Sequence, residues 1–135
     1  MNCLGHILIG LLLLSSYFWI GNAAILIAVA YVAVDIDHIQ ILIKEKAFSF
    51  NKIKEVIKNI DEKYDGNPKN AFDGQIFILH SVEFVIMLLI LAYFFYPRLY
   101  FVALGASLHI ITDIIHHLIR GFPIIKWLFL TSNLF

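Results

Sequence analysis

The sequence predicts an all-α integral membrane protein that forms a single membrane domain over residues 1–135. Hydrophobic residues make up 61% of the chain and charged residues only 15%, unlike an ordinary soluble domain. The apolar residues gather in four long stretches, and most of the charged residues fall in one segment between the second and third stretches. These observations favour a bundle of four transmembrane helices.

The four stretches have the length that a membrane span requires. A helix rises about 1.5 Å per residue, so about 20 residues cross a hydrocarbon core of about 30 Å. Gly21-Asn22 and Pro97-Arg98 supply short turns inside the two pairs of helices. The predicted spans cover residues 4–20, 23–43, 76–96 and 99–119.

Residues 44–74 form a charged connection between the second and third spans. Apolar residues repeat within it at helical spacing, which predicts an amphipathic helix with Ser49 or Asn51 as its N-cap. The repeat consists of Ile53, Val56, Ile57 and Ile60. We expect this helix to lie on the membrane surface or over the end of the bundle.

Basic residues indicate the orientation of the bundle. The lysines of the 44–74 connection lie on the same side of the predicted membrane as Arg120 and Lys126, whereas the opposite turns offer only Arg98. The positive-inside rule therefore places both termini and the connection in the cytoplasm. Residues 124–130 are too short to cross and predict a short interfacial C-terminal helix.

Ionisable residues inside the spans are the candidate functional residues. Each such residue makes the insertion of its helix into a membrane less favourable by about 2.5–3.5 kcal/mol, so these side chains usually face a partner or a water-filled cavity. In the predicted topology they all fall in the cytoplasmic half of the bundle. They are His6 in the first span, Asp35, Asp37 and His38 in the second, His80 and Glu83 in the third, and His109, Asp113 and His116 in the fourth.

Helical phase groups these residues on inward faces. Asp35 and His38 are three residues apart, as are His80 and Glu83, and the fourth-span residues stand at i, i+4 and i+7. Asp37 lies off the face of Asp35, so it either binds a second ion or orients a ligating histidine. The pattern predicts a cage of imidazoles and carboxylates.

Such a cage predicts a divalent metal ion, because carboxylates gathered in a low dielectric repel one another unless a cation lies between them. Imidazole and carboxylate ligands suit zinc first, with manganese or iron as alternatives, and the number of ligands allows one or two ions. Cys3 is the only cysteine, which argues against a thiolate zinc site.

Structural interpretations of the same residues stay open. His6 can lie at the headgroup level, and His80 with Glu83 can form a buried pair without metal. Asp35 and His38, like His109 and Asp113, can be hydrogen-bonded pairs in a purely structural bundle. His116 and His117 lie at the rim of the predicted membrane, and His116 is the one in phase with the other ligands.

Four motifs in this order resemble the YdjM-like family of prokaryotic membrane-bound metal-dependent hydrolases. They are Gly5-His6, Asp35-Ile36-Asp37-His38, His80-Ser81, and Gly105 followed at four-residue intervals by His109 and Asp113. The resemblance implies metal ligands at these positions in a multi-pass protein of the inner membrane. The layout is also remotely similar to zinc-dependent phospholipase C, which implies phosphoester chemistry on lipids.

The chain departs from the family pattern where the third span begins. Gln75 and Ile76 stand where the family has a histidine and an arginine, and Leu79 stands in place of a threonine. The histidine is a potential ligand and the arginine a phosphate clamp. Glu83 and His116 are the candidate replacements.

The leading hypothesis is therefore a divalent-metal hydrolase that cleaves a lipid or lipid-linked (phospho)ester with metal-activated water, while Asp37 or Glu83 relays the proton. The alternative is a non-catalytic metal-binding or ion-translocating membrane protein. The expected partners are membrane lipids, and a net charge of zero gives no reason to expect nucleic acid. A homo-oligomer is compatible with these patterns.

Overall fold

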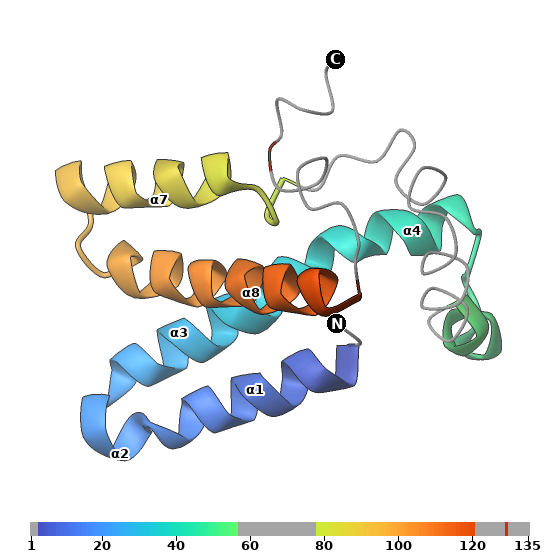
Figure 1. Cartoon of the computed structure of the whole chain (residues 1–135), viewed down its shortest axis with the longest axis horizontal. Helices are drawn as coiled ribbons and strands as arrows, with labels where there is room; N and C mark the ends of the chain where they lie inside the picture. Colours follow the sequence, from blue (N-terminus) through green and yellow to red (C-terminus); the bar gives the residue numbers. More distant parts are fainter. Residues whose placement is uncertain (1–2, 57–77, 121–128, 130–135) are drawn as a thin grey trace.

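The computed structural model describes residues 3–56, 78–120 and 129, and Figure 1 shows its arrangement. Within these ranges the chain is helical and has no β-strand, which confirms the all-α class. The elements are, in order, α1 (Cys3–Ser15), α2 (Tyr17–Ile20), α3 (Asn22–Ala33), the 3₁₀-helix η1 (Val34–His38), α4 (Ile39–Lys44), α7 (Val82–Phe94) and α8 (Leu99–Arg120).

Two helical stretches are long and apolar enough to cross a membrane. One runs from α3 through η1 into α4 and covers Asn22–Lys44, and the other covers Leu99–Ile119 of α8. They correspond to the predicted second and fourth spans. The stretch Gly5–Ile20 and helix α7 are also apolar but shorter, and residues 76 and 77 lie outside the described residues. The four-span bundle therefore stays a prediction.

The connection between α1 and α3 is set by local hydrogen bonds and one glycine. The hydroxyls of Ser15 and Ser16 donate to the carbonyls of Leu12 and Leu13, each at 2.6 Å, where α1 ends. Gly21 ends α2 with a φ of 56°, in the left-handed region that favours glycine. The chain then reverses into α3.

Helix α3 crosses α8 where both helices carry small residues. A Cβ atom on Gly105 would lie 2.3 Å from the backbone oxygen of Ile27 and 2.9 Å from the Cβ of Ala30, so no side chain fits there. Small residues let membrane helices approach closely and gain packing contacts. The close approach places the Tyr31 ring 5.1 Å from the ring of His109, one turn along α8.

Helix α7 packs on the other side of α8. The core between them includes Leu88, Ala103 and Ala106, together with Val34 from η1. Leu79, which precedes α7, also packs against this core. The segment that carries His80 is thereby held beside η1.

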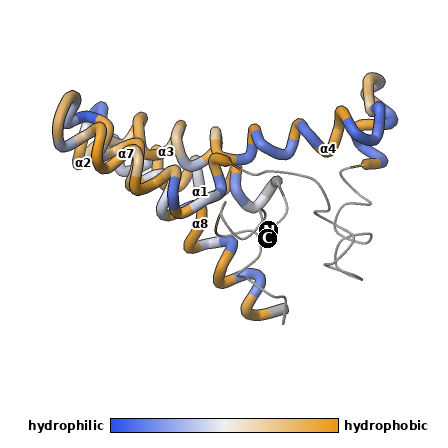
Figure 2. The backbone as a smooth tube through the Cα atoms, turned by 90° about the horizontal axis from the view of Figure 1, so that it is seen from above, coloured by the Kyte–Doolittle hydropathy of each residue, from blue (hydrophilic) through white to orange (hydrophobic). Residues whose placement is uncertain are grey.

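The outer surface of the helices is apolar. Phe18 and Trp19 of α2 are 92% and 89% exposed, and large hydrophobic side chains are also exposed along α1, α7 and α8. Figure 2 shows hydrophobic residues along most of α1, α3 and α7, with hydrophilic residues in the C-terminal part of α8 and near α4. A soluble monomer rarely exposes so much contiguous apolar surface, whereas lipid accepts it.

The charged connection begins as predicted in the part that the structure describes. Residues 50–56 are helical, and the backbone N–H of Lys52 donates to the Ser49 hydroxyl at 3.4 Å, so Ser49 acts as the N-cap. The remainder of the predicted amphipathic helix lies outside the described residues. The predicted C-terminal interfacial helix also does, apart from residue 129.

The helix ends that carry the polar residues converge. Figure 1 shows that the start of α1, the end of α3, the start of α7 and the C-terminal part of α8 lie on the same side of the molecule. The topology predicted from the sequence places the ionisable residues at these four ends.

Candidate metal centre

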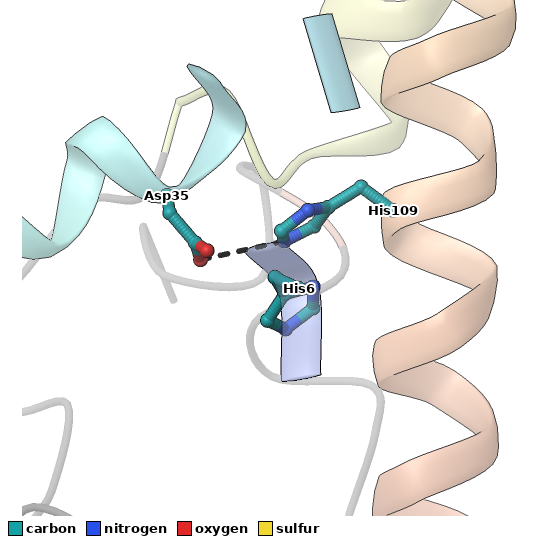
Figure 3. A group of neighbouring side chains, drawn as sticks. All are labelled: His6, Asp35 and His109. Atoms are coloured by element: carbon teal, nitrogen blue, oxygen red, sulfur yellow. Dashed lines mark ion pairs between the residues drawn. The ribbon is translucent and has the colours of Figure 1, made fainter. Parts of the chain in front are cut away.

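Six of the predicted ligands form one cluster at these helix ends. They provide three overlapping groups whose nitrogen and oxygen atoms lie within 4.8 Å of one another, so each group can hold a metal ion. Figure 3 shows three of the side chains, which come from α1, η1 and α8. The groups are His6, Asp35 and His109; Asp35, His38 and His80; and His80, His109 and Asp113.

The tautomer of His109 follows from its hydrogen-bond partner. Its Nδ1 atom lies 2.6 Å from the backbone oxygen of Tyr31, and a carbonyl oxygen only accepts, so Nδ1 carries a proton. The Nε2 atom of the neutral ring then has a lone pair. This atom is buried, makes no hydrogen bond of good geometry within the described residues, and lies 3.2 Å from Asp113 Oδ2 and 3.5 Å from Asp35 Oδ1.

The tautomer of His6 follows from a chain of three hydrogen bonds. The Thr112 hydroxyl donates to the carbonyl of Leu108 at 2.7 Å, so it accepts from the Tyr31 hydroxyl at 3.3 Å. The Tyr31 hydroxyl has only one proton, which it donates to Thr112. It therefore accepts a hydrogen bond from His6 Nδ1 at 3.2 Å. The His6 Nε2 atom, on the other side of the ring, lies 3.1 Å from Asp113 Oδ1.

Two buried imidazoles face the same carboxylate. The rings of His6 and His109 stack with their centroids 4.1 Å apart, and their side chains are 2% and 0% exposed. Protonating both rings would place two positive charges side by side in a low dielectric, where repulsion is strong. A metal ion between the rings and Asp113 would balance the charge of the carboxylate without that repulsion.

The spacing of the ligand atoms around His109 is that of ligands around a small metal ion. Metal–ligand bonds of about 2.0–2.2 Å place the ligand atoms of a tetrahedral ion about 3.3–3.6 Å apart. His109 Nε2 lies 3.2 Å from Asp113 Oδ2 and 3.5 Å from Asp35 Oδ1, whereas His80 Nε2 lies farther from the same two oxygens, at 3.9 and 3.8 Å. These atoms could therefore hold a metal ion.

Asp37 faces the Nδ1 side of the His80 ring, away from the other ligands, because residues 34–38 form a 3₁₀-helix. With three residues per turn, Asp35 and His38 point the same way and Asp37 points elsewhere. Its Oδ2 atom accepts the backbone N–H of Leu79 at 2.5 Å and lies 3.6 Å from His80 Nδ1. Since Leu79 contributes a backbone group, the residue type at that position does not affect this contact.

Besides Asp37, two predicted ligands do not join the three groups. His80 precedes α7, because Ser81 is extended and its hydroxyl accepts the N–H of Phe84 at 3.1 Å as an N-cap. The helical phase expected for His80 with Glu83 therefore does not apply, and Glu83 lies in the first turn of α7. His116 lies farther along α8, with its ring 6.0 Å from that of His117. Neither Glu83 nor His116 occurs in a metal-holding group of the described residues, so their ligand roles stay predictions.

Sequence reasoning missed Tyr31 and Thr112 as parts of the centre. The available signal was position: Tyr31 is the polar side chain one helical turn before Asp35, and Thr112 adjoins Asp113. Neither residue ligates a metal in the arrangement described above. Together they orient His6 and His109.

Thr112→Val is expected to weaken metal binding about tenfold, because partners that orient a ligating histidine contribute roughly 10- to 100-fold to affinity. Without its acceptor, the Tyr31 hydroxyl turns its proton towards His6 Nδ1, and the His6 proton moves to Nε2. Competition with a chromophoric chelator in detergent measures the affinity. Thr112→Ser retains the hydroxyl and should bind as the wild type does. Equal affinities in the two variants would contradict the assigned tautomer.

Comparison with known proteins places the chain in no family, since no family model, no curated protein and no solved structure matches it.

Proposed function

We propose that this protein is a membrane-embedded, divalent-metal-dependent hydrolase that cleaves a lipid or lipid-linked (phospho)ester. The observation that carries the proposal is the buried pair of imidazole nitrogens, Nε2 of His6 and of His109, that face Asp113 at 3.1 and 3.2 Å. The resemblance of four motifs to the YdjM-like hydrolases supports the same conclusion. Zinc is the first candidate ion, with manganese or iron as alternatives, because the donors are nitrogen and carboxylate oxygen.

The residues around the centre have separate roles in this proposal. A bound divalent ion polarises a phosphoryl or carbonyl oxygen and lowers the pKa of a coordinated water to about 7. Asp37 holds His80 in place, since it faces the ring nitrogen directed away from the other ligands. Glu83, in the first turn of α7, is the proposed proton relay.

Access to the centre is from the side of η1. The side chains of Asp35 and His38 are 21% and 40% exposed, whereas those of His6, His109 and Asp113 are at most 9% exposed. Helix α4 and the lysine-rich connection follow η1 directly. We propose a multi-pass protein of a prokaryotic inner membrane with both termini in the cytoplasm, so the substrate would enter from the cytoplasmic leaflet.

A non-catalytic metal-binding or ion-translocating protein is the alternative. An ion path across the membrane needs polar groups on both sides of the centre. Among the described residues, those buried in the half of the bundle away from the centre include Ala24, Ile27, Leu88 and Ala92, which are all apolar. This distribution favours chemistry at one membrane surface over transport.

The test reconstitutes the purified chain in phospholipid vesicles and measures release of headgroup or phosphate beside metal flux. We expect lipid turnover that stops on chelation and returns with Zn²⁺ or Mn²⁺. His109→Ala should be inactive under the same conditions. Metal flux without turnover would contradict the hydrolase and favour the translocator.

A further inference from the structure

We infer that the centre holds two divalent ions that share Asp35, and that the second ion is bound by His38 and His80 at the exposed edge. This inference rests on the metal centre of the proposed function and adds a second site to it. Two of the three metal-holding groups, His6 with His109 and His38 with His80, have only Asp35 in common.

The supply of donor atoms exceeds what one ion takes. Four histidines each offer one ring nitrogen to the centre, and the carboxylates of Asp35 and Asp113 offer four oxygens. A tetrahedral ion takes four ligands. Divided between two ions, the same set gives each ion two histidines and the shared Asp35 carboxylate; Asp113 completes the inner ion, and the outer ion keeps one position open. Open positions distinguish catalytic zinc sites from structural ones.

A single ion would not use every donor of the cluster. An ion at His80, His109 and Asp113 leaves out His6, whose Nε2 atom lies 3.1 Å from Asp113 Oδ1 and whose side chain is 2% exposed. The hydrogen bond between His6 Nδ1 and Tyr31 turns Nε2 towards this carboxylate, and His6 forms a metal-holding group of its own with Asp35 and His109. The inner ion is therefore placed between His6, His109 and the two carboxylates.

The outer ion then has its own donors. His38 Nδ1 lies 3.5 Å and His80 Nε2 3.8 Å from the same atom, Asp35 Oδ1. Their rings meet edge to face at 4.9 Å, so they approach this oxygen from different directions. Asp37 faces His80 on the ring nitrogen turned away from Asp35.

The charge of the centre favours two ions and an anionic ligand. Asp35, Asp37 and Asp113 carry three negative charges when ionised, and one divalent ion leaves an excess negative charge in a low dielectric. Two divalent ions leave one positive charge, which an anionic group of a substrate in the open positions neutralises. The substrate class that fits best is a phosphoester of a lipid. Because His38 is the most exposed ligand, the outer ion is the one that meets the substrate and exchanges faster.

The experiment measures metal content and magnetic coupling in protein loaded with Mn²⁺ and freed of excess ion. We expect two ions per chain and an electron paramagnetic resonance spectrum of a coupled pair, since a shared carboxylate couples the two spins. His38→Ala should retain one ion and show an uncoupled signal. His117→Ala, an equivalent change outside the metal-holding groups, should retain two coupled ions.

Each outcome addresses a separate claim. One ion in both the wild type and His38→Ala would overturn the second site and leave a mononuclear hydrolase intact. Two coupled ions without lipid turnover would support the second site and contradict the hydrolase. Asp35→Asn provides a further check, because loss of the shared carboxylate should abolish coupling even where metal remains.

Discussion

Asp113→Asn is expected to lose nearly all bound metal, with the metal content falling below about a tenth of the wild-type value. The carboxylate of Asp113 lies 3.1, 3.2 and 3.9 Å from ring nitrogens of His6, His109 and His80, so its two oxygens approach three of the four clustered histidines. The amide has the shape of the carboxylate but no charge. Because the loss of an outer partner alone reduces affinity about 10- to 100-fold, the loss of a direct ligand should reduce it further. Metal analysis after purification in mild detergent without chelator measures the effect.

Glu55→Gln is the matched control, since it neutralises an exposed carboxylate in residues 50–56, away from the cluster. It should retain the wild-type metal content. Circular dichroism of Asp113→Asn shows whether the helices persist. A folded Asp113→Asn protein with full metal content would refute the centre, as would a stable wild-type protein that contains no metal.

Asp37→Asn is expected to weaken metal affinity about 10- to 100-fold, although Asp37 is in none of the metal-holding groups of the described residues and acts through His80. One oxygen of its carboxylate, Oδ2, accepts the Leu79 N–H and also faces the Nδ1 atom of His80. An amide oxygen in the same place keeps the acceptor but removes the negative charge that favours a proton on His80 Nδ1, so His80 Nε2 becomes a weaker ligand. Titration with Zn²⁺ against a competing chelator measures the change.

Glu83→Gln separates orientation from proton transfer. If Glu83 relays the proton, this variant should bind metal with wild-type affinity and hydrolyse substrate about 100-fold more slowly, as expected for the loss of a general acid or base. A parallel loss of metal affinity in Glu83→Gln would instead make Glu83 a ligand.

For the Asp37→Asn variant described above, a wild-type metal affinity would show that His80 needs no partner on Nδ1.

The sequence predicts much of this architecture because lipid imposes simple rules. Apolar stretches of membrane length are helical, since backbone groups in hydrocarbon must pair within their own segment. Two of these stretches have the predicted length in the structure. The same rules make Asp35 and His109 conspicuous, because ionisable residues in such stretches are costly. The depth of each residue follows from counting along its helix.

The same rules do not predict where a helix departs locally from ideal α-helical geometry. An ideal α-helix through residues 23–43 turns 100° per residue, but Val34–His38 forms a 3₁₀-helix, which aligns Asp35 with His38 and turns Asp37 to Leu79. The predicted third span treats His80 as helical. Ser81 instead begins α7 as its N-cap, so His80 lies in the turn that precedes the helix. Neither feature has a distinct periodicity in the sequence.

By itself, therefore, the sequence determined the helical class, the two membrane-length helices and the identity of the clustered histidines and carboxylates, because composition and spacing along one chain are enough for these. Tertiary structure alone decided which ring nitrogen of His6 and of His109 faces the carboxylates. The tautomers of His6 and His109 depend on Tyr31 and Thr112, which are brought to them by the close crossing of α3 and α8 at Gly105. Which group donates and which accepts in each hydrogen bond depends on side chains that are neighbours in space but distant along the chain, so it cannot be read from a local stretch of sequence.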